Sequence, residues 1–254
     1  MTSISIAVIV CHYQQLEQLS QGLRSVACQL RTADQIVVVD DGSLPPPKQA
    51  DLDKLCSTPV TLLLNQHNHG GPAIPRNQAI QACHCSHLVF LDADDILMPH
   101  TLEALESVWT SQRSAIAYGD QICWGTEINR PFLRHALRSP ADRPPDSRQL
   151  YEQLLMGGNR LCLSGSGGPT ELFLSHPFDP HQRWEDYDLW LRLAQSGHYF
   201  QHTERIHTLY RLQHGSRSGS RRARHQGCQG IQNNHLQSRP RWRWPLWYWK
   251  QRFL

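Results

Sequence analysis

The sequence has no apolar run of the roughly 18 residues that a membrane-spanning helix requires. Its first residues, Met1-Thr2-Ser3-Ile4, lack the basic start of a secretory signal. The eight cysteines are scattered and include no CxxC pair, as is typical of thiols that a reducing compartment keeps reduced. Since 39% of the 254 residues are hydrophobic, general disorder is excluded. We expect a folded cytoplasmic protein without disulfides.

The net charge of +3 is distributed unevenly along the chain. Residues 201–254 contain 11 Lys or Arg and one acidic residue, Glu204, whereas 14 basic and 21 acidic residues precede them. The balance is therefore −7 over the first 200 positions and +10 over the last 54. This asymmetry suggests an acidic site that faces cations and a basic end that faces anions.

Strand and helix patterns alternate through the first 115 residues. Buried strands are predicted at 4–10, 36–39, 60–64 and 88–91, and helices at 16–30, after the three prolines at 45–47, around 75–80, and after Pro99. Continuously apolar strands favour a parallel sheet covered by helices on both faces. The predicted fold class is α/β, with a Rossmann-like, mostly parallel sheet.

The second half is less regular. Residues 138–145 are a proline-rich connection, and 185–195 have helical spacing. The glycine-rich run 164–168 lacks the lysine of a phosphate-binding loop, so we expect a flexible segment, either a mobile acceptor lid or a linker.

Polar clusters follow three of the predicted strands. They are Cys11-His12-Tyr13, Asp40-Asp41 and Asp92-Ala93-Asp94. In open parallel sheets ligands bind beyond the carboxyl ends of the strands. The oxygen ligands of Asp92 and Asp94 can hold Mg²⁺ or Mn²⁺ and leave positions open for diphosphate oxygens. Turn chemistry alone accounts for Asp40-Asp41-Gly42-Ser43 equally well, but the combination of clusters favours a functional site.

These residues resemble the family 2 glycosyltransferases, inverting sugar transferases with the GT-A fold. The matching segments occur in the family's order, from about residue 4 to residue 218. They are Val39-Asp40-Asp41-Gly42-Ser43, Asn68-x-Gly70, Arg76-Asn77, Phe90-Leu91-Asp92-Ala93-Asp94-Asp95, Phe178-Asp179, Trp184 to Leu193, and Tyr210-Arg211-x-x-His214-x-Ser216. Two positions differ from the family pattern: Cys11-His12-Tyr13-Gln14 replaces Pro-x-Tyr-Asn, and Pro75 replaces the alanine before Arg-Asn, so a helix is predicted to begin at Pro75.

The resemblance assigns a role to each matching residue. It implies that Asp40 contacts the uracil or ribose of a nucleotide-sugar, with Tyr13 near the base. Asp92 is implied as a ribose or sugar contact and a metal ligand, and Asp94 as the metal ligand proper. The catalytic base corresponds to Asp186. The remaining substrate-binding residues that it implies are Arg76, Glu185, Arg211 and His214.

The helical spacing around Asp186 is compatible with that role. Tyr187, Trp190, Leu191 and Ala194 would bury one face and leave the acidic residues near the helix start on the other. The alternative is that these acids only stabilise the helix N-terminus electrostatically. The resemblance thus implies an inverting sugar transfer that uses Mn²⁺ or Mg²⁺. The donor it implies is a nucleotide-diphosphate sugar, UDP-linked in this interpretation, and the acceptor is a hydroxyl of a glycan or lipid-linked molecule in cell-envelope polysaccharide synthesis.

Three alternatives stay open. The chain can be a nucleotide-sugar binding module that has lost catalysis, or it can bind nucleic acid through Arg217, Arg221, Arg222 and Arg224, although the acidic strand ends argue against that. The cluster Cys83-His84-Cys85-Ser86-His87 suggests zinc, but its spacing is not that of a standard finger.

We expect a glycosyltransferase domain over residues 1–218, with a nucleotide-sugar half at 1–120 and an acceptor half at 121–218. Residues 219–254 form a basic, tryptophan-rich tail, and 239–254 interleave Lys and Arg with aromatic residues. Such a composition favours peripheral contact with an anionic membrane surface, or packing of the aromatic rings on the core.

Overall fold

The computed structural model describes residues 3–136, 147–213 and 221–237. The first half contains β1 Ile6–His12, α1 Leu16–Ala27, β2 Gln35–Asp40, α2 Gln49–Leu52, β3 Val60–Leu64, α3 Ala73–Gln81, β4 His87–Asp92, β5 Ile96–Leu97 and α4 Thr101–Ser111. The second contains β6 Ile116–Gly125, β7 Phe132–Arg134, α5 Ser147–Gly157, β8 Gly167–Pro169, α6 Thr170–Ser175, α7 Glu185–Gln195, β9 Phe200–Leu212, α8 Arg221–Ile231 and a π-helical segment, η1, Gln232–Leu236.

The strands form one sheet in the order β3-β2-β1-β4-β8-β6-β9-β5, with β7 paired to β6. The first four strands are parallel, as their apolar sequences predict. Strands of the second half add antiparallel pairs between β4 and β8 and between β8 and β6, and a parallel pair between β6 and β9. The predicted α/β class with a Rossmann-like sheet and flanking helices is confirmed.

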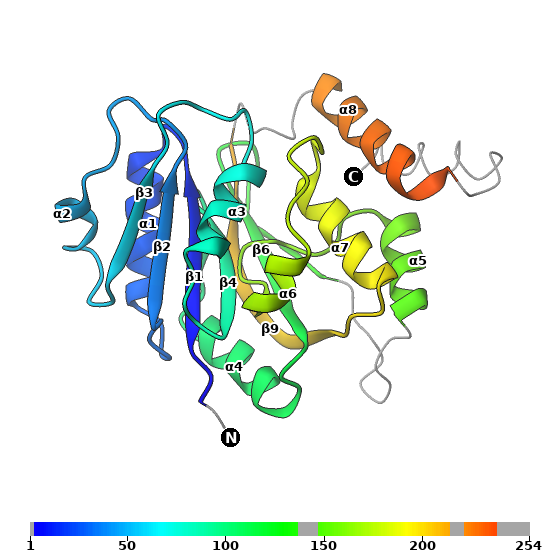
Figure 1. The fold of residues 1–254 in the computed structure, drawn as a ribbon, viewed down its shortest axis with the longest axis horizontal. Coiled ribbons are helices and arrows are strands. Elements are labelled where there is room, and N and C mark those ends of the chain that lie inside the picture. The colour runs from blue at the N-terminus through cyan, green and yellow to red at the C-terminus, as the bar shows by residue number, and fades with distance from the viewer. Residues whose placement is uncertain (1–2, 137–146, 214–220, 238–254) are drawn as a thin grey trace.

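Each face of the sheet has its own hydrophobic core. One core joins the sheet to α3, α5, α6 and α7, and the other joins it to α1 and α4. Successive side chains of β1 contribute alternately, since Ile9 lies in the first core and Val8 in the second. Figure 1 shows α3 in front of the sheet and α1 behind it. The continuous apolar runs in the strands are therefore explained by burial on both faces.

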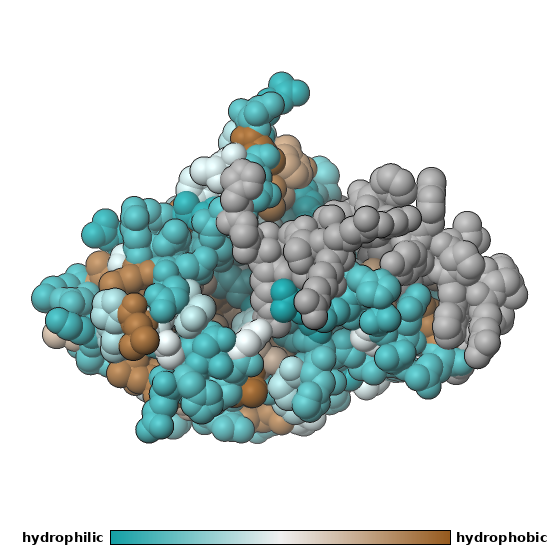
Figure 2. Space-filling model, turned by 90° about the horizontal axis from the view of Figure 1, so that it is seen from above, coloured by the Kyte–Doolittle hydropathy of each residue, from teal (hydrophilic) through white to brown (hydrophobic). Residues whose placement is uncertain are grey.

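The order of the strands places the polar clusters along one edge. The chain adds β2 and β3 on one side of β1 and then returns to place β4 on the other, so the strand order reverses between β1 and β4. His12 pairs in register with Asp40, and Cys11 with Asp92. Figure 2 looks onto this edge from above the view of Figure 1, and the visible surface is mainly hydrophilic.

The glycine-rich segment 164–168 differs from its prediction. Ser164, Ser166, Gly167 and Gly168 are buried, and Gly167 begins β8 between β4 and β6. A Cβ on Gly167 would lie 2.0 Å from the carbonyl oxygen of Leu88. The expectation of a flexible lid or linker is therefore wrong, because the glycines permit close approach of neighbouring backbones inside the sheet.

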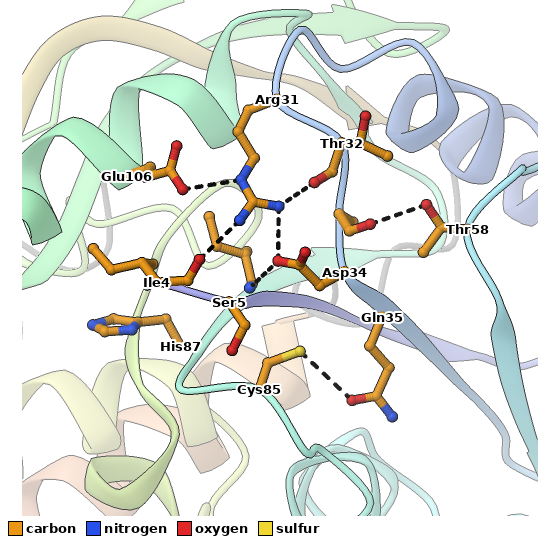
Figure 3. A network of polar contacts seen from close by, with 12 residues as sticks. Ile4, Ser5, Arg31, Thr32, Asp34, Gln35, Thr58, Cys85, His87 and Glu106 are labelled. Carbon is orange, nitrogen blue, oxygen red and sulfur yellow. Dashed lines mark hydrogen bonds and ion pairs between the residues drawn. The ribbon is translucent and has the colours of Figure 1, made fainter. Parts of the chain in front are cut away.

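The opposite edge of the parallel strands is held by Arg31. Its Nε donates to Glu106 of α4 at 3.1 Å, and its Nη2 donates to the carbonyl of Ile4 at 3.0 Å (Figure 3). Its Nη1 lies 2.7 Å from Asp34 Oδ2, which also accepts the backbone N–H of Ile6 at 2.7 Å. These contacts fix the start of β1 against the loop before β2, far along the strands from the polar clusters.

The described part of the C-terminal segment packs on the core. Ile231 and Leu236 are buried in the same core as α7. A Cβ on Gly227 of α8 would lie 2.4 Å from the Trp184 ring, so α8 lies directly against the residue before α7. The predicted boundary at 218 stays a prediction, and the aromatic residues at 239–254 lie outside the described residues.

Candidate active site

Arg76 on α3 binds two carboxylates from different parts of the chain. Its Nη2 donates to Asp92 Oδ1 and its Nη1 to Glu185 Oε1, each at 2.6 Å. Arg76 and Glu185 are buried, while a third of the Asp92 side chain is exposed. Burial opposes the charge of Arg76, but the two carboxylates raise its pKa, so it stays protonated. The end of β4 and the start of α7 are thereby joined.

Asp92 and Asp94, separated by Ala93, form a DxD pair, and its second carboxylate, Asp94, lies beside the end of β9. Gln213 Nε2 donates to Asp94 Oδ2 at 3.2 Å, and Arg211 Nε donates to the backbone carbonyl of Asp94 at 2.7 Å. The Arg211 guanidinium also lies over the Trp124 ring, with Cζ 4.2 Å from its centroid. Burial and the neighbouring charge of Asp92 raise the pKa of Asp94 to about 6.

Ser164 connects the residues around the DxD pair. Its hydroxyl accepts the backbone N–H of Asp92 at 3.0 Å and donates to Asp95 Oδ2 at 2.6 Å. The other oxygen of Asp95 accepts the backbone N–H of Arg211 at 2.9 Å. Asp95 is buried, and desolvation together with Asp94 and Asp92 raises its pKa well above the usual value. Asp95 therefore fixes the loop after β4 to β9 rather than facing a ligand.

The predicted base Asp186 lies in the first turn of α7, next to Glu185. Asn159, in the loop after α5, donates from Nδ2 to Asp186 Oδ2 at 2.8 Å. Burial and the charge of Glu185 raise the pKa of Asp186 to about 6, against the opposing effect of Arg76. A carboxylate with this pKa accepts a proton readily near neutral pH and is still ionised there.

Asp40 and Tyr13 lie on the other side of the site. Asp40 is fully buried, and its carboxylate accepts the backbone N–H of Ser43 at 2.9 Å and bonds to His12 Nδ1 at 2.7 Å. The backbone N–H of Gln15 donates to His12 Nε2, so the Nδ1 nitrogen carries the proton that Asp40 accepts. Tyr13 is 45% exposed beside this pair. The direct contact of Asp40 with a nucleotide stays a prediction.

The loops after β1 and β2 are further tied together by Gln14, whose backbone N–H donates to Ser43 Oγ at 2.8 Å. His12 has a lowered pKa because desolvation outweighs the bond to Asp40. It is thus a neutral donor that supports the carboxylate. This buried histidine occupies a position that the sequence comparison with the family left without a role.

The site suits a divalent metal held mainly by substrate. Among the described residues, no three His, Cys, Asp or Glu side chains are grouped as metal ligands, at 83–87 or elsewhere. Mg²⁺ is commonly bound by one or two carboxylates and completed by phosphate oxygens and water. Asp92 and Asp94 offer that number. Burial first, and then the charge of Asp92, raise the pKa of Asp94, and a bound cation would oppose both effects.

The structure brings Arg76, Asp92 and Glu185 into direct contact and places Arg211 against the backbone of Asp94. His214 lies outside the described residues. Sequence reasoning assigned no role to Asn159, Ser164 or Gln213. Only Gln213 had a signal, since it falls inside the matching segment that contains Arg211 and His214.

The fold defines the class of protein. The structure superposes on residues 1–349 of TarS from S. aureus with a TM-score of 0.67 and 17% identity, over 98% of this chain and 72% of that one. A crystal structure of the same TarS segment in complex with UDP-GlcNAc matches with a TM-score of 0.66 and 19% identity, over 92% and 68% of the two chains. The chain has the GT-A glycosyltransferase fold.

Sequence relationships establish the family. The model of glycosyl transferase family 2 matches residues 7–166, and the chain belongs to this family and is a glycosyltransferase. It is 24% identical to the amylovoran biosynthesis glycosyltransferase AmsE of Erwinia amylovora, over 76% of this chain and 70% of that protein. It is 26% identical to an uncharacterized glycosyltransferase of Nostoc sp., over 65% of this chain and half of that protein.

Proposed function

We propose that the chain transfers a sugar from a UDP-linked donor to a hydroxyl acceptor, with inversion at the anomeric carbon. The observation that carries the proposal is the Arg76 bridge, which joins Asp92 of the DxD pair to the residue before Asp186. A donor-side carboxylate and the residue directly before the candidate base are thus attached to one guanidinium. The fold shared with TarS, whose crystal structure contains UDP-GlcNAc, supports the nucleotide.

In this proposal Asp186 removes the proton of the acceptor hydroxyl as that oxygen attacks the anomeric carbon. The nucleoside diphosphate leaves from the opposite face, and a single displacement inverts the configuration. No covalent glycosyl-enzyme is required, so the mechanism needs no serine or cysteine nucleophile. The pKa of Asp186, about 6, suits a base that works near neutral pH.

Asp94, with Asp92 beside it, would hold Mn²⁺ or Mg²⁺. The bound metal would neutralise charge on the diphosphate leaving group. Arg211 lies at Asp94 and adds a fixed positive charge on the same side. Asp40, His12 and Tyr13 would form the nucleoside end of the site, with the exposed Tyr13 ring available for stacking on the base.

The acceptor is proposed to be a glycan or lipid-linked hydroxyl of a cell-envelope polysaccharide, because AmsE is named for amylovoran biosynthesis. In the part of the chain that the structure describes, no helix is long and apolar enough to cross a membrane. Peripheral contact with an anionic membrane through 239–254 is therefore a proposal that rests on the sequence alone.

The direct test is incubation of the purified protein with a panel of UDP-sugars and Mn²⁺, with UDP release as the readout. Release that requires the metal and falls in Asp186→Asn supports the proposal. If the protein binds the donor but releases no UDP with any acceptor that is tried, it is instead a binding module without catalysis. A lack of both UDP binding and UDP release would contradict a UDP-linked donor.

A further inference from the structure

The loop between α5 and β8 contributes a side chain to the proposed catalytic base. Asn159 lies on this loop and donates from Nδ2 to Asp186 Oδ2 at 2.8 Å, a short bond to an acceptor that is ionised at neutral pH. One oxygen of the carboxylate is thereby occupied. A backbone hydrogen bond from Tyr187 also favours the ionised carboxylate, so Asn159 holds Oδ2 while an acceptor hydroxyl would approach Oδ1.

The orientation of the Asn159 amide is fixed by its second contact. Its Oδ1 accepts the backbone N–H of Leu161 at 3.3 Å, so the amide nitrogen points to Asp186. An amide turned the other way would place two acceptor oxygens against each other and two donors against each other. The network therefore selects the donor for the carboxylate.

The loop is registered against α7 by contacts on both sides of Asn159. The Tyr187 hydroxyl donates to the carbonyl of Leu154 at 2.7 Å, near the end of α5. Gly158 has φ +83°, a conformation that glycine adopts without strain, and its N–H donates to the same carbonyl at 2.9 Å. Arg134 of β7 donates to the backbone carbonyl of Asn159 at 3.0 Å. Contacts with the end of α5, with β7 and with α7 thus fix the position of the Asn159 side chain.

We propose that Asn159 is a positioning residue for the transfer reaction: it orients the Asp186 carboxylate and stabilises its ionised form, so that Oδ1 accepts the proton of the acceptor hydroxyl. This inference rests on the proposed role of Asp186. Loss of the Asn159 donor releases Oδ2 and removes one of the hydrogen bonds that favour the charge of the carboxylate, while the backbone bond from Tyr187 remains.

Charged or titratable groups on five surrounding segments interact electrostatically with Asp186. They are Glu185 on α7, Arg76 on α3, Asp92 on β4, Cys162 in the loop before β8, and Tyr210 on β9. The substitution of Asn159 leaves all of them in place. A change in the titration of Asp186 in Asn159 variants is therefore attributable to the lost bond.

The test measures the titration of Asp186 directly, by ¹³C NMR of protein labelled at the aspartate carboxyl carbons. Asp186→Asn identifies the signal. Asn159→Ala removes the donor and should raise the pKa of Asp186 by about 0.5 to 1 unit, and Asn159→Asp, which places a carboxylate there, should raise it further. Arg160→Ala, an exposed change at the next position, is the matched control and should leave it unchanged.

A second measurement follows UDP release, with water as the acceptor, from the UDP-sugar of the panel that wild type turns over fastest. Asn159→Ala should lower kcat roughly 10-fold or more with little change in the donor KM, because the donor does not contact this loop in the proposal. If Asp186 titrates within about 0.2 units of wild type in both Asn159 variants, the inference is wrong. If Asp186→Asn retains full release while the Asn159 variants shift the titration, the base assignment fails and the hydrogen bond stands.

Discussion

Arg76 Nη1 lies 2.6 Å from Glu185 Oε1, although the two residues are 109 positions apart in the chain. The bond joins α3 of the parallel half to the start of α7 in the second half. Because the same guanidinium also binds Asp92, the position of the candidate base depends on a residue that belongs to the donor side. In the proposed function, this guanidinium would connect donor binding to the placement of the base.

The first prediction concerns this guanidinium. Arg76→Lys should lose most UDP–Mn²⁺ affinity and turnover, because a single ammonium cannot reproduce a planar fork that binds two separate carboxylates. Arg76→Ala should in addition destabilise the protein by about 3–5 kcal/mol, since it leaves Glu185 buried without this partner. Calorimetry with UDP and Mn²⁺ and thermal unfolding measure the two effects.

Arg31 provides the control. It also binds carboxylates, Glu106 and Asp34, but at the opposite ends of the strands (Figure 3). Arg31→Ala should lower the melting temperature and leave the UDP affinity of the folded protein unchanged. If both substitutions reduced affinity to the same extent, the loss would reflect general instability rather than the site.

The second prediction concerns the metal. Asp94→Ala should abolish the metal-dependent part of UDP binding, because this carboxylate is proposed to link the cation to the diphosphate. Asp94→Asn can still accept the hydrogen bond from Gln213, but it lacks the negative charge and should also lose metal-dependent UDP binding. Titrations with UDP in the presence of Mn²⁺ and in excess chelator test this. Unchanged affinity in either variant would remove Asp94 from the proposed metal site.

Much of the sheet was predictable because its strands carry apolar residues on both faces. Val60–Leu64 and Glu185–Gln195 have the bounds that their patterns gave, and α3 begins at Ala73, two residues before the predicted start at Pro75. The edge of the sheet that holds the polar clusters followed from the same patterns, since parallel strands end on one side.

Contacts between distant segments were not predictable in the same way. Ser164 and Asn159 have no local pattern, and their roles arise only when β8 and the loop after α5 are placed beside β4 and α7. The run 164–168 was predicted to be flexible because it is rich in glycine and lacks the lysine of a phosphate-binding loop. Its glycines instead serve close backbone packing, which no local rule distinguishes.

A third prediction tests that correction. Gly167→Ala should destabilise the protein by about 3 kcal/mol or more, because the added methyl group would overlap the carbonyl of Leu88 and no side chain can move aside. Gly157→Ala, at the end of α5, is the control, since its nearest neighbour, Arg160 Cδ, lies 4.0 Å away. Thermal and urea unfolding give both values, and similar stabilities for the two variants would contradict the buried position of Gly167.

A fourth prediction concerns the aromatic and basic residues at 239–254. Deletion of 240–254 should reduce binding to anionic liposomes at low salt, because each Lys or Arg near such a surface contributes about 1 kcal/mol of binding free energy. The affinity for UDP should be preserved. Co-sedimentation with and without anionic lipid measures the first effect. If the full-length protein ignores anionic liposomes, the membrane proposal fails, and if the truncated protein is insoluble, these residues belong to the core.

The last prediction concerns Asp186 and its neighbour on α7, Asp188. Asp186→Asn should keep donor affinity and lower turnover by roughly 10²- to 10⁴-fold, the usual effect of losing a positioned base. The substitution should also change how stability depends on pH. The pKa of Asp186 is raised to about 6 in the folded protein, so its favourable contribution is present below the unfolded pKa of about 4 and is lost as pH rises through 6.

Replacing Asp186 by Asn removes that loss, which amounts to about 1–3 kcal/mol for a shift of this size. The melting temperature of Asp186→Asn relative to wild type should therefore be higher at pH 7.5 than at pH 4.5, by roughly 2 °C or more. Asp188 should behave oppositely. It is buried, and bonds from His235, Arg192 and Asn234 lower its pKa against the effect of burial.

Asp188 thus stabilises the fold above pH 4, and this contribution is lost as pH falls through its lowered folded pKa. Asp188→Asn should lower the melting temperature at pH 7.5, in contrast to Asp186→Asn, because it weakens the contacts of α7 with η1. Circular dichroism melts of both variants between pH 4.5 and 7.5 measure the two signs. If the melting temperature of Asp186→Asn relative to wild type is lower at pH 7.5 than at pH 4.5, the wild-type Asp186 carboxylate is not held in the unfavourable ionised state that a raised pKa requires.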